Sequence, residues 1–286
     1  ITEGLVGSEM CIRDSKQGYF HSIRFPDLFS FSRVFVNLKN SVILISHGTH
    51  TRQNDRLANI IASESLGLGL TFSKEKRIDL ISQSIYCDQF LDSMKLPYKK
   101  VNRIFNKNFY FSKNINLSKR NRKTKILYIG TVKQLGARRY YFESSAEFFE
   151  SIENIYKKLV KFKDNFEISV RIRDVNYEID NKILSNAIKH RKDLIKTSNE
   201  KSIYEEMHNC DCIISYSSTT LEEGLMMQKP VMCFGLPGYN HLKLYEDENS
   251  LSNKKYLNKN LKIIEKSLGK KFIHKSPIKR KVDYKF

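Results

Sequence analysis

The stretch DCIISYSSTTLEEGLMMQKPVMCF, residues 211–234, decides the fold class of this chain. Its apolar run at 211–215 ends in a hydroxyl cluster, which is typical of a buried strand that leads into a loop. Residues 219–227 then predict a helix, and a second apolar run follows at 230–234. Strand, helix and strand in immediate succession require a right-handed crossover between parallel strands. The stretch therefore predicts an α/β protein with a mostly parallel sheet.

The same alternation extends upstream, so that it covers residues 125–245. Further strands are predicted at 125–129, 166–172 and 194–195, and further helices at 148–162, at 178–191 and from Ser202 onward. Ser144 with Glu147, and Ser202 with Glu205, have the spacing of a capping box at a helix start. We expect a complete Rossmann-like domain here, with ligands at the carboxyl ends of its strands.

The first part of the chain contains a shorter alternating series. Strands are predicted at 41–46 and 78–82, and helices at 52–64 and 84–94. We interpret residues 16–112 as the end of another Rossmann-like domain and the polar, basic residues 113–124 as a linker. The predicted fold class is therefore α/β with two Rossmann-like domains, the first incomplete. Residues 246–286 are expected to form a basic tail with one helix near 255–268.

Residues 1–15 differ in composition from the Lys- and Asn-rich remainder. They resemble a translated sequencing-adapter segment, and such segments are excluded from fold reasoning. We expect them to be non-native and the first domain to be truncated at its amino end. The alternative is an ordinary amino terminus.

Composition limits the choice of function. Among the 286 residues, 40% are hydrophobic and 28% are charged, as in ordinary globular proteins. The net charge of +19 would suit nucleic acid, an anionic membrane surface or a phosphorylated substrate. The lysines are scattered and not interleaved with stacking aromatics, which disfavours nucleic acid. Composition bias together with weak surface attraction is the simplest account of this charge. The five cysteines are few and odd in number, and we expect them to be buried and reduced, as in a cytoplasmic protein. The alternative location is a peripheral one, at the inner face of the plasma membrane.

A cluster of hydroxyls stands where the helix at 219–227 is predicted to begin. Free backbone N–H groups and the helix dipole make such a position an anion site, to which hydroxyls add donors. Glu223, one turn into the helix, could accept hydrogen bonds from ribose hydroxyls. The alternative is that Thr219 with Glu222, or Thr220 with Glu223, merely caps the helix. The candidate donor-binding hydroxyls are Ser217, Ser218, Thr219 and Thr220.

This stretch resembles the donor-site motif of GT-B glycosyltransferases. It is also similar to the CDP-glycerol glycerophosphotransferase and UDP-N-acetylglucosamine 2-epimerase-like families. Glu223 falls at the glutamate position of that motif, six residues before Lys229, and Gln228 stands where the motif usually has glycine. The resemblance implies a site for the nucleotide of an activated donor.

A second motif, His47-Gly48-Thr49-His50-Thr51-Arg52, follows the predicted strand 41–46. It resembles the His-Gly-Thr-x-x-Lys motif of CDP-glycerol glycerophosphotransferase-like enzymes, with Arg52 in place of the lysine. The resemblance implies that His47 is the general base, a role that an imidazole can fill at neutral pH. Gly48, Thr49 and Arg52 would contact the acceptor or its phosphate. The alternative is a turn with an exposed histidine.

A third candidate lies at the start of the predicted second domain. Gly130 and Thr131 follow the strand 125–129, and Arg171 and Arg173 stand near the end of the next strand. We expect Gly130, Thr131 and Arg173 to contact the donor diphosphate, whereas a solvated sheet face is the alternative for the arginines.

Together these motifs predict a transferase. It would move a glycosyl or glycerophosphoryl group from a nucleotide sugar or CDP-alditol donor to a surface-polysaccharide or lipid-linked acceptor. No Asp-x-Asp motif and no Gly-x-x-x-x-Gly-Lys loop is present, so we expect no metal and no cofactor besides the donor. The alternatives are an epimerase that acts on a UDP-sugar and a non-catalytic basic protein that binds nucleic acid or anionic membrane.

Overall fold

A computed structural model describes two compact units. They comprise residues 1–104 with 279–286, and residues 105–278. Each unit is treated by itself. The described residues are 17–20, 32, 34, 37–39, 41–45, 78–83, 85–101, 123–130, 145–172, 182, 184–198, 202–216, 218, 220–234 and 259–273.

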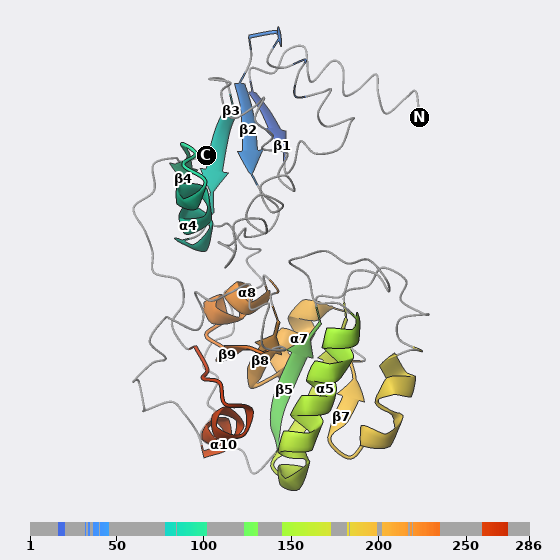
Figure 1. Cartoon of the computed structure of the whole chain (residues 1–286). Helices are drawn as coiled ribbons and strands as arrows, with labels where there is room; N and C mark the ends of the chain where they lie inside the picture. The colour runs from blue at the N-terminus through green and yellow to red at the C-terminus, as the bar shows by residue number, and fades with distance from the viewer. Residues whose placement is uncertain are drawn as a thin grey trace. The chain divides into compact units, whose positions relative to one another are not determined.

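The first unit contains a parallel sheet with the strand order β1-β2-β3-β4 (Figure 1). Its strands are β1 (Gln17–Phe20), β2 (Ser41–Ile45), β3 (Ile78–Ser82) and β4 (Lys99–Lys100), and α4 (Ile85–Ser93) follows β3. The side chains of Leu44, Leu80, Phe90 and Leu91 form a buried cluster between the sheet and this helix. Strands β2 and β3 and helix α4 confirm the prediction. Strands β1 and β4 were not predicted, because β1 lies in an ambiguous aromatic-rich segment and β4 is only two residues long.

The second unit is a five-stranded parallel sheet with the order β7-β6-β5-β8-β9. Every strand predicted over 125–245 is present. The elements are β5 (Thr124–Ile129), α5 (Ser145–Leu159), η2 (Val160–Phe162), β6 (Phe166–Arg171), η3 (Lys189–Arg191), β7 (Ile195–Thr197), α7 (Ile203–Asn209), β8 (Cys212–Ser215), α8 (Thr220–Met226), β9 (Val231–Cys233) and α10 (Lys259–Leu268).

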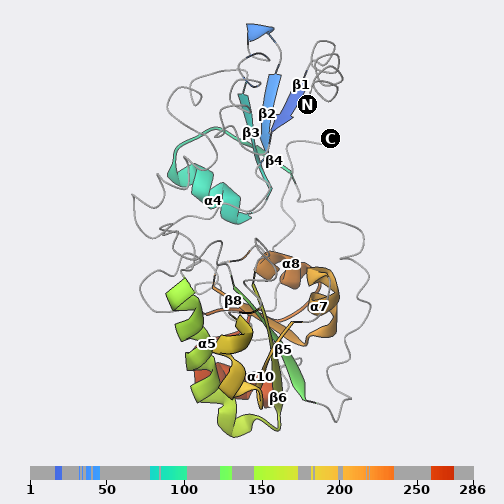
Figure 2. The same cartoon turned by 90° about the vertical axis from the view of Figure 1, so that its right-hand side faces the viewer.

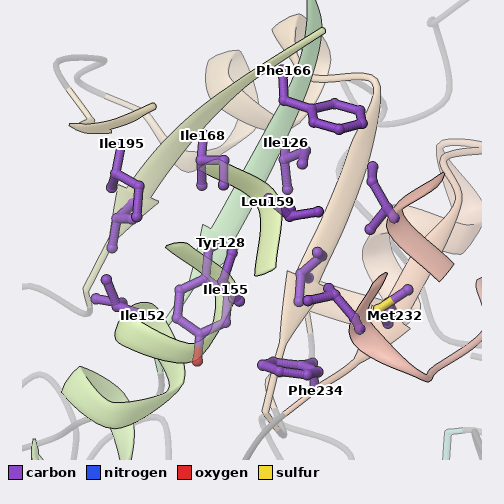
Figure 3. Close-up of a cluster of buried hydrophobic side chains, with 14 of the residues drawn as sticks. Ile126, Tyr128, Ile152, Ile155, Leu159, Phe166, Ile168, Ile195, Met232 and Phe234 are labelled. Carbon is purple, nitrogen blue, oxygen red and sulfur yellow. The ribbon is translucent and has the colours of Figure 1, made fainter. Parts of the chain in front are cut away.

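Helices cover both faces of this second sheet (Figure 2). Helices α5 and α10 contribute Phe148, Ile155 and Ile264 to a core cluster that also contains Ile126 and Tyr128 of β5 (Figure 3). On the opposite face α8 packs so closely that a Cβ atom on its Gly224 would lie 2.7 Å from Ile213. The unit is therefore a doubly wound α/β layer structure.

The strand order places a topological switch point beside β5. This strand comes first in the unit but lies at the centre of the sheet, so the chain leaves it on one side to form β6 and β7 and returns on the other side to form β8. At the carboxyl ends the hydroxyl of Ser215 donates a 2.6 Å hydrogen bond to the carbonyl of Ile129. Ligands of such sheets bind outside the carboxyl ends at this point.

Helix α10 belongs to the core of the second unit, although the sequence placed its residues in a basic tail. Leu261, Ile264 and Leu268 are buried in the core cluster. Beyond the helix, Ile273 forms an antiparallel bridge with Val231. The predicted helix near 255–268 is thus confirmed in its existence and in its last residue, and residues 259–273 are packed structure.

Helix α8 ends in a Schellman turn. The N–H of Lys229 donates to the carbonyl of Gly224 at 2.9 Å, and the N–H of Gln228 donates to that of Leu225 at 3.0 Å. Gln228 therefore has left-handed backbone, with φ 58°, and Lys95 beyond α4 has φ 56°. Glycine is the usual residue in this conformation, which explains why the similar motifs have glycine where this chain has glutamine.

Among the described residues, no helix combines the length and the apolar character that crossing a bilayer would require.

Candidate functional site

Gly130 stands at the switch point, directly after β5. It is buried, and its N–H donates to the carbonyl of Arg171 at 2.8 Å. The ring of Phe148 packs on its Cα, since a Cβ atom there would lie 2.7 Å from the Cδ2 atom of that ring. Phe148 in turn stacks on Tyr128, with ring centroids 5.8 Å apart. Gly130 is thus required by packing, whatever ligand approaches this edge.

The start of α8 lies at the carboxyl end of the neighbouring strand β8. The hydroxyl of Ser218 accepts a hydrogen bond from the N–H of Thr220 at 3.2 Å, and the Ser218 carbonyl accepts from Leu221 at 3.0 Å. The Oγ1 atom of Thr220 is buried and has no hydrogen-bond partner in the described part of the chain. The Ser218 hydroxyl thus bonds one N–H group at the start of this helix, and Thr220 does not act as the cap in a pair with Glu223. The alternative pair of Thr219 with Glu222 stays a prediction, because Thr219 lies outside the described residues.

Two glutamates lie in the first turn of α8, and the structure distinguishes them. Glu222 is buried, with 2% of its surface exposed, whereas Glu223 is half-buried. Negative charge is favourable near a helix amino end, so both positions suit carboxylates. Glu223 is the more accessible of the two, as a contact with a bound ribose requires, and its assignment to the donor stays a prediction.

Hydroxyl groups with unused hydrogen-bonding capacity gather at the carboxyl side of the sheet. Ser145 opens α5, Thr220 opens α8, and Ser198 follows β7. Their side-chain oxygens are buried without a hydrogen-bond partner among the described residues. Buried hydroxyls in native proteins are nearly always bonded to protein, water or ligand. The sequence motifs did not identify Ser145 and Ser198, although Ser198 directly follows β7 and Ser145 begins the helix that comes after β5.

Arg171, the last residue of β6, forms an ion pair within the second unit. Its Nη1 lies 3.3 Å from Oε2 of Glu206 on α7, and the two side chains are 15% and 5% exposed. Removing one partner of so buried a pair would leave the other charge without compensation. The guanidinium thus stabilises the packing of α7 on the sheet, and Arg173 lies outside the described residues.

Lys229 is also a structural residue. It lies at the amino ends of the strands, whereas the candidate site lies at their carboxyl ends. The side chain is 1% exposed, and its Nζ donates to the carbonyls of His208 at 2.8 Å and of Cys210 at 2.5 Å. These carbonyls belong to the carboxyl end of α7, where a cation also complements the helix dipole. The Lys-Pro step of the motif therefore fixes α7 against the start of β9.

The described cysteines, Cys87, Cys210, Cys212 and Cys233, are free and buried, which confirms that part of the prediction. Burial raises the pKa of the Cys210 thiol to about 12, against the opposing influence of the nearby Lys229 ammonium. Burial also raises the pKa of Cys212 well above the ordinary value. Thiolates are the reactive form, so these residues are not nucleophiles at neutral pH.

Several predicted site residues lie outside the described part of the chain, and their assignments stay predictions. They are His47, Gly48, Thr49, Arg52, Thr131, Arg173, Ser217 and Thr219. Strand β2 ends at Ile45, so the histidine motif does follow the carboxyl end of a parallel strand. Among the described residues, no group of three or more His, Cys, Asp or Glu side chains could hold a metal ion.

The fold and the switch-point edge define a GT-B-like α/β protein. The family model of the LIC12162 family transferases matches residues 30–249, and the chain belongs to this family. A search of curated proteins found no significant match.

Solved structures are similar to this chain at low sequence identity. The Staphylococcus aureus MnaA-UDP co-structure has a TM-score of 0.50 and 12% identity, covering 80% of this chain and 61% of that chain. A glycosyltransferase from Rickettsia africae has a TM-score of 0.47 and 16% identity, covering 80% and 60%. The wall teichoic acid polymerase TagF, as its H444N variant, has a TM-score of 0.39 and 19% identity, covering 69% and 50%. The chain thus spans between half and about three fifths of these proteins.

Proposed function

We propose that this transferase is a glycosyltransferase that uses a nucleotide-activated donor. It transfers a glycosyl group, or in a variant reaction a glycerophosphoryl group, to a hydroxyl of a surface polysaccharide or lipid-linked acceptor. The observation that carries the proposal is the strand order of the second unit. That order puts Gly130 and the start of α8 at the switch point, in a chain that belongs to a transferase family.

In this proposal the second unit binds the donor. Backbone N–H groups and hydroxyls at the start of α8 contact the diphosphate, and Glu223 accepts hydrogen bonds from the ribose. Gly130 and Thr131 allow the nucleotide to approach the end of β5, and Arg173 neutralises phosphate charge. The hydroxyls concerned are Ser217, Ser218, Thr219 and Thr220. The buried Oγ1 of Thr220, which has no hydrogen-bond partner among the described residues, supports a polar ligand at this position.

The chemistry is a displacement at the donor. His47 removes the proton from the acceptor hydroxyl, whose oxygen forms a bond to the anomeric carbon as the bond from that carbon to the nucleoside diphosphate breaks. In the glycerophosphoryl variant the oxygen forms a bond to the phosphorus that carries the glycerol, and the bond from this phosphorus to the bridging oxygen breaks, so that CMP leaves. Gly48, Thr49 and Arg52 hold the acceptor or its phosphate, and the dipole of α8 stabilises charge on the departing diphosphate. The reaction as proposed uses no metal.

The fold likeness supports a nucleotide ligand of this kind. The solved structure with the TM-score of 0.50 is a complex with UDP. That protein shares only 12% identity with this chain, so the choice between uridine and cytidine nucleotides is open to experiment.

Donor binding can be tested by calorimetry on the full chain with UDP and CDP. Glu223→Gln should weaken the preferred nucleotide about 5- to 150-fold, because it removes a charged acceptor of ribose hydrogen bonds worth about 1–3 kcal/mol. The matched control is Glu150→Gln, the same change at an exposed position of α5. Equal affinities of the two variants would reduce Glu223 to a structural residue of the helix start.

Transfer can be tested by product analysis with labelled nucleotide sugars, CDP-glycerol and a lipid-linked acceptor. A labelled acceptor together with released nucleotide supports the proposal. An epimerised nucleotide sugar formed without acceptor would replace it with the epimerase alternative. His47→Ala should lower turnover on the order of a hundredfold and leave donor affinity unchanged. The control His190→Ala, at an exposed position of η3, should change neither turnover nor donor affinity. Wild-type turnover in His47→Ala would exclude this residue as the base.

A further inference from the structure

The outward face of α10 carries a row of lysines. Lys259, Lys262 and Lys266 are exposed, and their spacing of three and four residues places them on one side of the helix. The opposite side is apolar and buried in the core of the second unit; its residues are Leu261, Ile264 and Leu268. The helix thus separates a basic surface from an apolar interior.

Contacts at both ends of α10 hold this lysine face on a rigid support. Asn260 donates from Nδ2 to Oγ1 of Thr124 at 2.9 Å, at the first residue of β5. At the other end, Val231 and Ile273 exchange backbone hydrogen bonds of 3.0 and 2.7 Å at the first residue of β9. The helix therefore lies at the amino ends of the strands, away from α8 and the candidate donor site (Figures 1 and 2).

Several lysines elsewhere in the described chain are paired with acids. Those pairs are Lys99 with Asp79 at 2.9 Å, Lys157 with Glu153 at 3.3 Å, Lys163 with Asp193 at 3.7 Å and Lys196 with Glu167 at 3.1 Å. No ion pair between described residues involves Lys259, Lys262 or Lys266. The acid of this helix, Glu265, accepts a 2.9 Å hydrogen bond from the N–H of Phe272. Lys270 and Lys271 follow directly, so residues 259–273 hold five lysines against one acid.

We propose that this lysine face docks the protein on an anionic lipid bilayer. Lysines near such a surface contribute about fivefold each to binding, the equivalent of about 1 kcal/mol, and their attraction is screened by salt. The ammonium groups are mobile point charges, which suits a layer of headgroups without fixed geometry. Nucleic acid fits less well, because the exposed side chains of 259–273 include no arginine and no aromatic ring. The inference does not depend on the proposed transfer reaction, and docking at this edge would leave the donor edge accessible.

The test is co-sedimentation of the full chain with vesicles of phosphatidylcholine alone or with added phosphatidylglycerol, at low and high salt. The wild-type chain should bind only the anionic vesicles, and salt should release it. The triple variant K259Q/K262Q/K266Q should bind on the order of 100-fold more weakly, since three lysines are removed. The matched control is K182Q/K189Q/K192Q, which removes the same charge at exposed positions of the same unit. Circular dichroism melting should show that both variants remain folded.

The control variant decides between a docking face and general attraction. If it loses as much binding as the α10 variant, the net charge alone is responsible and the proposal fails. The proposal also fails if wild type binds neutral vesicles equally well, or if the α10 variant binds like wild type. A DNA duplex that binds the chain more tightly than the vesicles, with the same loss in K259Q/K262Q/K266Q, would assign the face to nucleic acid.

Discussion

Replacing Gln228 by glycine should stabilise the second unit. Gln228 occupies the left-handed position of the Schellman turn after α8, with φ 58°. This conformation costs a residue with a Cβ about 1–2 kcal/mol. Glycine avoids that cost but loses about 0.5–1 kcal/mol more conformational entropy on folding. The side chain of Gln228 is exposed, so little packing is lost. The net expectation is a gain of about 0.5–1 kcal/mol, or roughly 1–4 °C in Tm for a unit of this size.

The measurement must report on the second unit, because two units need not unfold together. Hydrogen exchange with mass spectrometry suits this purpose, since peptides within 220–234 report on α8 and its turn, and peptides within 85–101 serve as an internal reference. Gln228→Gly should slow exchange in the first set and leave the second unchanged. Gln228→Ala is the control, because alanine keeps the Cβ and with it the backbone cost. Equal stability of the glycine and alanine variants would show that the left-handed backbone of Gln228 carries no such cost.

Three further predictions concern buried positions of the same unit. Gly130→Ala should lower the free energy of unfolding by about 1–3 kcal/mol in urea titration, because its Cβ would overlap the ring of Phe148; an unchanged midpoint would mean that the ring shifts freely. Lys229→Met should cost about 2–4 kcal/mol, since two helix-end carbonyls lose their donor, and a melting temperature equal to wild type would contradict that role. Cys210 should resist iodoacetamide at pH 8 in the folded chain and react in guanidinium, because burial raises its pKa to about 12. Because the folded pKa of Cys210 is raised, its contribution to the free energy of unfolding is fully present below the unfolded thiol pKa near 8.5 and is lost as pH rises above that value. Rapid labelling of the folded chain would contradict the raised pKa on which both expectations depend.

Much of the fold could be predicted from the pattern of apolar residues. The strand predicted at 78–82 is present with the same ends, and the helical stripe from Phe148 to Leu159 faces the core. The pattern could not give the order β7-β6-β5-β8-β9, because strand neighbours depend on crossovers and not on the periodicity of any single strand. Nor could it show that α10 docks on the core, since the helix is basic on its outer side and its partner residues lie far away in the sequence.

The candidate site was predictable in position but less so in detail. The motif located the start of α8 at the end of a buried strand, as the structure has it. The Thr220 N–H donates to the hydroxyl of Ser218, whereas from the sequence alone three neighbouring hydroxyls fit this helix start equally well. The ion pair between Arg171 and Glu206 could not be predicted, because the two residues lie 35 positions apart in the sequence. Long-range ion pairs of this kind leave no local pattern in a sequence.

The central place of β5 has a consequence during synthesis of the chain. Its two sides acquire their neighbours at different times, because β6 follows within one helical crossover whereas Ser215 of β8 lies 86 residues after its partner Ile129. At about 5–20 residues per second, the ribosome needs roughly 4–17 s to make that interval. During this interval the N–H and C=O groups on one side of the apolar strand β5 have no partner strand. An unpaired apolar edge of this kind promotes aggregation. Strand β5, joined first by β6 and then by β7, must therefore persist without β8 during this interval, and slower translation anywhere between β5 and β8 lengthens it.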